Sequence, residues 1–190
     1  MEINSTSMMI NDINIRCFYA GEGTDTIMLL HGAGVDSAMM SWQEVMQLLS
    51  AKYRVIAPDL PGYGGSDRIS GEYSLAFYTE IVRGVIEAFE SSPIVLAGLS
   101  LGGGISLNIA LEYPELIKLL IPVDSWGIFP RLPYHRLTYW YTRSRLNDRL
   151  YQWAGKYEWL VRWSLEYSLI GDRTKITKSL VKEIQKSMLE

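Results

Sequence analysis

Residues 98–102 read Gly-Leu-Ser-Leu-Gly and contain the side chain best placed to do chemistry, that of Ser100. The apolar run before them, residues 93–97, predicts a short buried strand, and residues 101–112 predict a helix that starts directly after the serine. A G-x-S-x-G pattern at such a strand-to-helix turn exposes the serine hydroxyl. The chemistry it predicts is nucleophilic attack by Ser100, with the start of the helix stabilising a nearby negative charge.

The glycines on either side of the serine have a physical reason to be there. Side chains at Gly98 and Gly102 would crowd the point where the strand meets the first helical turn. The Leu101 amide lies among the first N–H groups of the helix, which have no acceptor within the helix. A glycine-rich turn without catalytic function would show the same five residues, so the remaining elements must decide between the two interpretations.

Length and composition suit an ordinary globular domain. The chain has 190 residues, 48% of them hydrophobic and 21% charged, and a net charge of −3. Its first residues lack the basic and apolar regions of a signal peptide, and no apolar run is long enough to span a membrane, which predicts a cytoplasmic location. One cysteine, Cys17, excludes an internal disulfide and a cysteine-based zinc site. No metal, cofactor or nucleic-acid partner is expected.

Strand and helix patterns alternate along the chain. A hairpin is expected over residues 8–10 and 13–19, and strands over 26–30, 53–57 and 117–123. A capping box at Ser41 and Glu44 predicts a helix over residues 41–50, and a second amphipathic helix is expected over 74–89. This alternation predicts an α/β fold with a mostly parallel, doubly wound sheet.

Three glycine-containing motifs follow three successive strands of this pattern. They read HGAG at residues 31–34, DLPGYGGSD at 59–67 and GLSLGGG at 98–104. Together they resemble the α/β-hydrolase superfamily, in particular its branch of serine-nucleophile esterases, C–C bond hydrolases and haloperoxidase-like enzymes. The resemblance covers about residues 13–126 and implies an α/β-hydrolase fold.

The resemblance also implies roles for individual residues. Ser100 would be the nucleophile, and the backbone N–H groups of Ala33 and Leu101 would form the oxyanion hole. His31, Gly32 and Gly34 would shape the oxyanion loop, so that His31 would have a structural role and would not act as the base.

The same resemblance shows what the chain does not supply. In the family the triad acid and histidine usually follow later strands, and completing the fold would take roughly 60 to 90 further residues. The C-terminal strands are therefore expected to be absent, leaving residues 117–123 as an apolar sheet edge. Asp124 is a candidate acid, with a local loop contact as its alternative role. His135 is a candidate base, with a surface position in the cap as its alternative.

The composition changes near residue 130. Residues 1–130 hold 6 Lys and Arg against 15 Asp and Glu, whereas residues 131–190 hold 12 against 6. The predicted domains are an α/β core at 1–126 and a helical cap at 127–190. Ten Tyr and Trp residues between 134 and 167 predict cap packing with some lining of a pocket for an apolar or aromatic carbonyl substrate. Membrane contact is not expected, and the oligomeric state stays open.

The predicted function is that of a serine hydrolase which cleaves an ester, lactone or similar activated carbonyl through an acyl-enzyme. One alternative is a C–C bond hydrolase of the same fold. Another is a non-catalytic small-molecule receptor or interaction module on this scaffold. Because no triad histidine is evident, the chain by itself is expected to be a weak catalyst.

Overall fold

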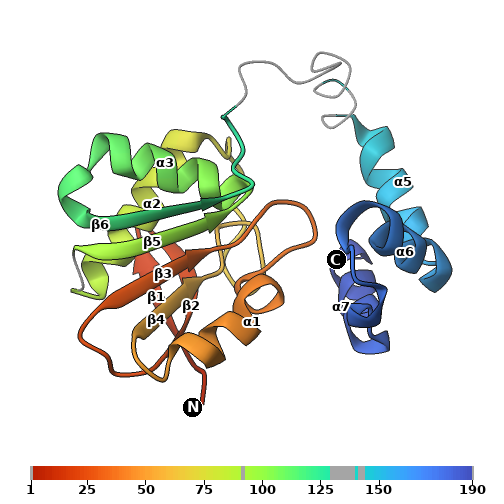
Figure 1. The fold of residues 1–190 in the computed structure, drawn as a ribbon. Helices are drawn as coiled ribbons and strands as arrows, with labels where there is room; N and C mark the ends of the chain where they lie inside the picture. The colour runs from red at the N-terminus through yellow and green to blue at the C-terminus, as the bar shows by residue number, and fades with distance from the viewer. Residues whose placement is uncertain (1, 91–92, 129–139, 141–143, 190) are drawn as a thin grey trace. The chain divides into compact units, whose positions relative to one another are not determined.

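The structure, a computed structural model, describes residues 2–90, 93–128, 140 and 144–189 (Figure 1). The chain divides into two compact units, Met1–Phe129 and Pro130–Glu190, which are described separately. The predicted boundary after Trp126 falls near the end of the first unit. Within the described ranges, no helix is long and apolar enough to cross a membrane.

The first unit is built on a six-stranded sheet in the order β1-β2-β4-β3-β5-β6. Its strands are β1 (Asn4–Ile10), β2 (Ile13–Ala20), β3 (Thr26–Leu30), β4 (Arg54–Pro58), β5 (Ile94–Leu99) and β6 (Ile117–Val123). Strand β2 pairs antiparallel with β1 and β4, while β4, β3, β5 and β6 run parallel. The mostly parallel α/β architecture predicted from the sequence is therefore confirmed.

Helices cover both faces of this sheet (Figure 1). Helix α1 (Ala38–Leu49) lies on one face, and α2 (Leu75–Ala88) and α3 (Leu101–Glu112) lie on the other. Strand β3 is buried along its whole length because alternate side chains enter the two cores. Ile27 and Leu29 pack with Met46 of α1, whereas Met28 and Leu30 pack in the α2 and α3 core.

Helix α1 begins one turn earlier than its sequence predicts. Its N-cap is Ser37, whose hydroxyl accepts a hydrogen bond from the Met40 N–H. The predicted cap at Ser41 was wrong because both serines have suitable side chains and a long-range contact selects the earlier one. That contact is the buried carboxylate of Asp59, which accepts the Ala38 N–H at 2.9 Å.

Strand β6 forms one edge of the sheet. It pairs with β5 alone among the described strands. Its side chains Leu119, Ile121 and Val123 are 54%, 43% and 37% exposed. The expected apolar edge is therefore present in the first unit.

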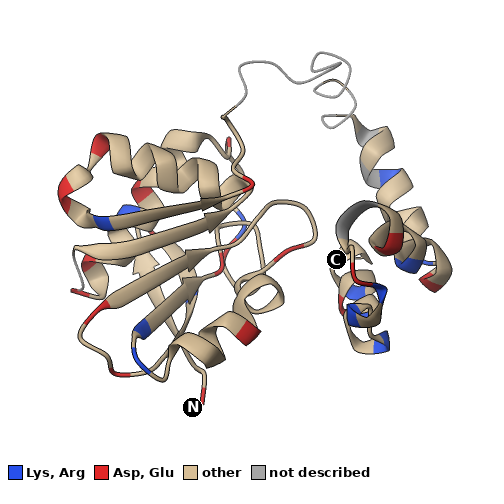
Figure 2. Ribbon diagram, in the orientation of Figure 1, with Lys and Arg blue, Asp and Glu red and all other residues tan. Residues whose placement is uncertain are grey.

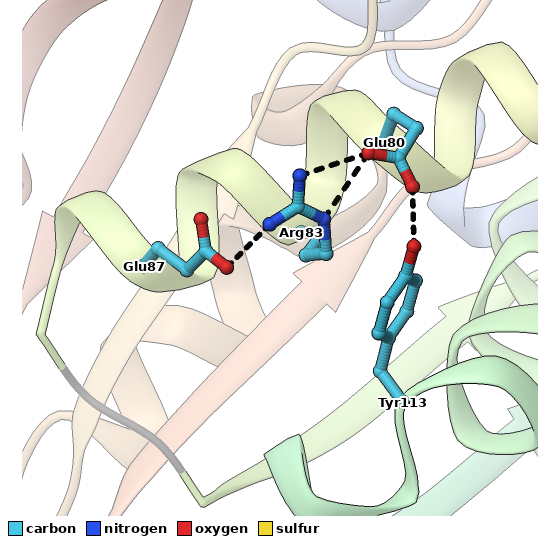
Figure 3. Close-up of polar contacts among 4 residues, drawn as sticks. All are labelled: Glu80, Arg83, Glu87 and Tyr113. Atoms are coloured by element: carbon cyan, nitrogen blue, oxygen red, sulfur yellow. Dashed lines mark hydrogen bonds and ion pairs between the residues drawn. The ribbon is translucent and has the colours of Figure 1, made fainter.

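A polar cluster ties the outer surfaces of α2 and α3 together (Figure 3). Tyr113, at the end of α3, donates a 2.6 Å hydrogen bond to Glu80 of α2. The other Glu80 oxygen accepts from Arg83, which also pairs with Glu87. These hydrogen bonds lower the pKa of Glu80. The carboxylates are largely solvated, so the cluster orients the two helices more than it stabilises them.

The second unit consists of short helices. They are α5 (Arg145–Gly155), α6 (Glu158–Ser164) and α7 (Lys178–Leu189), with a π-helical turn at Leu165–Leu169 and a 3-10 turn at Arg173–Lys175. The amide of Gln185 in α7 donates to the Gly155 carbonyl at 3.0 Å, which ties α7 to the end of α5. Lysine and arginine residues recur along these helices (Figure 2).

The core of the second unit is aliphatic, and the packing predicted for the cap aromatics stays a prediction. The buried side chains are Val161, Leu165, Ile176, Val181 and Ile184. In contrast, Trp153, Trp159, Trp163 and Tyr167 are between 51% and 65% exposed. Three short helices enclose only a narrow interior, which branched aliphatic side chains fill.

Candidate active site

Ser100 lies at the turn between β5 and α3, with a backbone conformation of φ 49° and ψ −109°. Non-glycine residues rarely adopt a positive φ because the Cβ atom collides with the backbone. The surroundings hold this conformation at both ends of the residue. The Ser100 N–H donates to the Val123 carbonyl at 2.9 Å, and the Ser100 carbonyl accepts from the N–H groups of Trp126 and Gly104. The serine is partly exposed.

Gly98 and Gly102 permit two close approaches around this turn. A Cβ on Gly98 would lie 2.2 Å from the Gly102 carbonyl oxygen and 2.5 Å from the Ser106 hydroxyl. A Cβ on Gly102 would lie 2.5 Å from the Leu30 carbonyl oxygen. The first turn of α3 therefore packs directly on the ends of β5 and β3, as the G-x-S-x-G spacing predicts.

His31 is fully buried and bridges two loops. Its Nε2 accepts a 2.9 Å hydrogen bond from the Leu60 N–H, so the ring proton lies on Nδ1, which donates to the Gly32 carbonyl at 2.8 Å. Burial lowers the pKa of His31. Both nitrogens of the neutral His31 ring are thus hydrogen-bonded to backbone groups. Neither is left to take a proton from Ser100.

Acid is expected to destabilise the first unit through His31. Its folded-state pKa is below the usual 6.5, so below that pH the unfolded chain binds a proton that the folded chain does not. The free energy of unfolding should therefore fall by up to about 1.4 kcal/mol per pH unit as the pH is lowered below 6.5. Urea unfolding at several pH values measures this slope, with His135 replaced by Gln so that one imidazole remains.

A His31→Gln variant on the same background provides the comparison. Its unfolding free energy should be nearly flat over that pH range, because no imidazole is left to titrate. Equal slopes in the two proteins would contradict the assignment. The ¹⁵N shifts of the His31 ring report its tautomer independently of the variant's stability.

The oxyanion loop predicted at residues 31–34 lies against the serine. A Cβ on Gly32 would be 3.6 Å from the Ser100 Cβ. Gly32 is buried, Ala33 is exposed, and Gly34 has a positive φ of 85°. Among the described residues, the N–H groups of Ala33 and Leu101 have no hydrogen-bond acceptor. The two predicted oxyanion donors therefore come from elements in direct contact, and each keeps its N–H available.

Two carboxylates that the sequence did not single out, one buried (Asp59) and one partly buried (Asp36), organise the surrounding loops. Asp59 accepts the N–H groups of Ala38 and Gly65, and Asp36 accepts those of Gly32 and Ser37. Both aspartates occur in the motif-bearing loops after β3 and β4, and this position is the sequence signal that could have identified them. Tyr63, in the same loop as Asp59, packs against His31 in a T-shaped arrangement with the ring centroids 5.1 Å apart. Burial raises the pKa of this tyrosine.

The candidate acid and base have different outcomes. Asp124 follows β6 directly, has a φ of 43°, and lies between the two residues that hydrogen-bond the Ser100 backbone, Val123 and Trp126. Its role as the acid stays a prediction. His135 lies outside the described residues. In the part of the chain that the structure describes, no group of three or more His, Cys, Asp or Glu side chains is placed to hold a metal ion.

Comparisons with known proteins identify the family of this fold. The family model for the alpha/beta hydrolase fold matches residues 25–189. A 2-hydroxymuconate semialdehyde hydrolase from Pseudomonas sp. strain CF600 is 37% identical over 107 residues, which cover 55% of this chain and 38% of that protein. A pimeloyl-[acyl-carrier protein] methyl ester esterase from Aeromonas hydrophila is 36% identical over 124 residues, covering 59% of this chain and 46% of the esterase.

A solved structure extends the similarity along the chain. The meta-cleavage product hydrolase of Pseudomonas fluorescens IP01 superposes with a TM-score of 0.78 at 26% identity, over 97% of this chain and 64% of the other. The matched segments span less than half the length of these curated relatives. They cover 38% of the semialdehyde hydrolase, 46% of the esterase and 31% of an uncharacterised protein from Mycobacterium bovis.

Proposed function

This chain belongs to the alpha/beta hydrolase fold family, and from that premise we propose that it is the nucleophile-bearing part of a serine hydrolase. The substrate class is an ester, lactone or similarly activated carbonyl, cleaved through an acyl-enzyme. One observation carries the proposal. Ser100 is held in a sparsely populated backbone conformation at the start of α3, beside a loop whose Ala33 N–H has no acceptor among the described residues.

The proposed reaction follows from this arrangement. The Ser100 oxygen attacks the carbonyl carbon as a base removes its proton, and the carbonyl oxygen becomes an oxyanion. The N–H groups of Leu101 and Ala33 donate to that oxygen, and the positive end of the α3 dipole favours its charge. Collapse of the intermediate expels the leaving group and leaves the acyl group on Ser100, which water then removes.

The general base lies outside the described residues in this proposal. His31 is the one histidine in the described ranges, and its two ring nitrogens are engaged with Gly32 and Leu60. Asp124 would orient a base from the end of β6, the strand beside the one that leads to Ser100. Without its base, a serine hydrolase retains roughly 10³- to 10⁴-fold catalysis over water from its oxyanion hole and binding alone.

A fluorophosphonate probe tests the proposal directly. The chain is incubated overnight with excess probe, digested, and analysed by mass spectrometry for the modified residue. An adduct on Ser100 supports an activated nucleophile in this chain. No adduct, or an adduct on another serine, contradicts the proposal and favours a non-catalytic receptor on the same scaffold.

C–C bond hydrolysis is the second candidate, favoured by two relatives. Besides the semialdehyde hydrolase described above, the similar proteins include a 2-hydroxy-6-oxo-2,4-heptadienoate hydrolase from Pseudomonas putida F1. Supplying a simple carboxylic ester and 2-hydroxy-6-oxo-2,4-heptadienoate side by side distinguishes the candidates. If the heptadienoate is hydrolysed and the carboxylic ester is not, C–C bond hydrolysis would replace ester cleavage as the proposed reaction.

A further inference from the structure

The loop that carries the Ala33 amide is attached to helix α1 through one carboxylate, that of Asp36. Its Oδ2 accepts the Gly32 N–H at 2.7 Å, and its Oδ1 accepts the Ser37 N–H at 2.8 Å. The Ser41 hydroxyl, in the first turns of α1, lies 2.8 Å from both carboxylate oxygens. Two N–H donors and one hydroxyl thus surround this partly buried side chain.

These contacts fix the two peptide planes that meet at Gly32. Asp36 holds the Gly32 N–H, which belongs to the peptide between His31 and Gly32. The His31 ring holds the Gly32 carbonyl, which belongs to the next peptide, and that peptide also contains the Ala33 N–H. In a planar trans peptide the C=O and N–H groups point in opposite directions. Fixing the Gly32 carbonyl therefore also fixes the direction of the Ala33 N–H.

Glycine at position 32 makes this double attachment necessary. Without a Cβ, the backbone at Gly32 can rotate through conformations that other residues cannot reach. A Cβ there would lie 3.0 Å from Asp36 Oδ2, a tight contact that would push against the carboxylate, and 3.6 Å from the Ser100 Cβ. The His31 ring fixes the peptide that follows the Gly32 Cα, and the Asp36 carboxylate fixes the peptide that precedes it.

We propose that Asp36 is a positioning residue which, by holding the Gly32 N–H against helix α1, aims the Ala33 N–H at the oxyanion formed on Ser100. The inference rests on the proposed function and deepens it. Asp36 touches neither the substrate nor the reacting atoms. Its carboxylate acts through the backbone at Gly32, and α1 supplies the rigid support.

The test compares three variants by their rate of Ser100 modification with a fluorophosphonate. Asp36→Ala should lower the second-order rate constant about 10- to 100-fold, less than the loss of a whole oxyanion donor. Asp36→Asn keeps one oxygen for the Gly32 N–H and should recover most of that loss. Ser37→Ala is the matched control: it removes the α1 N-cap hydroxyl but not the contact to Gly32, and should change the rate by less than about twofold.

Backbone amide exchange followed by NMR tests the same inference without catalysis. The Gly32 amide should exchange at least about tenfold faster in Asp36→Ala than in Ser37→Ala. Equal exchange in the two variants, or equal labelling of wild type and Asp36→Ala, would overturn the inference. An equal loss of labelling in Ser37→Ala would also overturn it, because the effect would then belong to α1 stability. If wild-type Ser100 takes no label, the proposed function fails and Gly32 exchange alone decides the role of Asp36.

Discussion

Replacing Ser100 with glycine is expected to abolish fluorophosphonate labelling and, at the same time, to make the protein more stable. The nucleophile is lost with the hydroxyl. The strain is lost as well, because glycine adopts a φ of 49° without a steric penalty. Relief of about 1 to 3 kcal/mol of backbone strain exceeds the extra entropy that glycine gives the unfolded chain, so a net gain of about 1 kcal/mol should result. Mass spectrometry of the adduct and urea unfolding measure the two effects.

Ser100→Ala is the matched control for this prediction. It removes the same hydroxyl but keeps the Cβ atom, and therefore the strain. Both variants should take no label, and only the glycine variant should unfold at a higher urea concentration. Equal midpoints for the glycine and alanine variants would show that the turn stores no strain at this residue.

Replacing Gly98 with alanine is expected to have the opposite effect and to destabilise the protein strongly. The new methyl group would lie 2.2 Å from the Gly102 carbonyl oxygen, which belongs to the backbone and cannot rotate away. Strand β5 and helix α3 would have to separate, and both are central to the first unit. A loss of about 3 kcal/mol is expected, which corresponds to a fall in Tm of about 10 °C for a chain of this size.

Gly71→Ala is the matched control for the Gly98 variant. A Cβ at Gly71 would meet only the Ile69 side chain, at 3.5 Å, which is an ordinary contact. This variant should stay within about 0.5 kcal/mol of the wild type in urea unfolding. An equally small effect at Gly98 would mean that β5 and α3 are less closely packed than the structure shows.

The sheet and the Ser100 turn could be predicted from the sequence because their signals are local. Strands β3 and β6 have the predicted bounds, and α3 covers the residues expected. Buried parallel strands appear as short apolar runs, and the tight turn requires glycine at the two positions that have it. The fold assignment also drew on three motifs in a fixed order, which together are far more specific than any one of them.

The support for the oxyanion loop could not be predicted, because its contacts depend on distant segments. Nothing local distinguishes Ser37 from Ser41 as a helix cap, and the choice depends on Asp59, 21 residues beyond Ala38. The hydrogen bond from the Leu60 N–H to His31 likewise joins residues that are 29 positions apart. The aliphatic core of the second unit was not singled out because aromatic residues dominate the sequence pattern there, whereas the described ones, such as Trp159 and Trp163, are exposed.

The place of β3 between β4 and β5 matters for folding during synthesis. Strand β3 can pair with β4 once both have left the ribosome, but its other side stays open until the chain has been made as far as Leu99. Nascent chains that stall before that residue expose a row of unpaired backbone groups on a strand whose last four residues are apolar, which chaperones recognise and other chains can join. The turn that carries Ser100 follows β5 directly, so the proposed nucleophile takes its place beside β3 only when β5 joins the sheet.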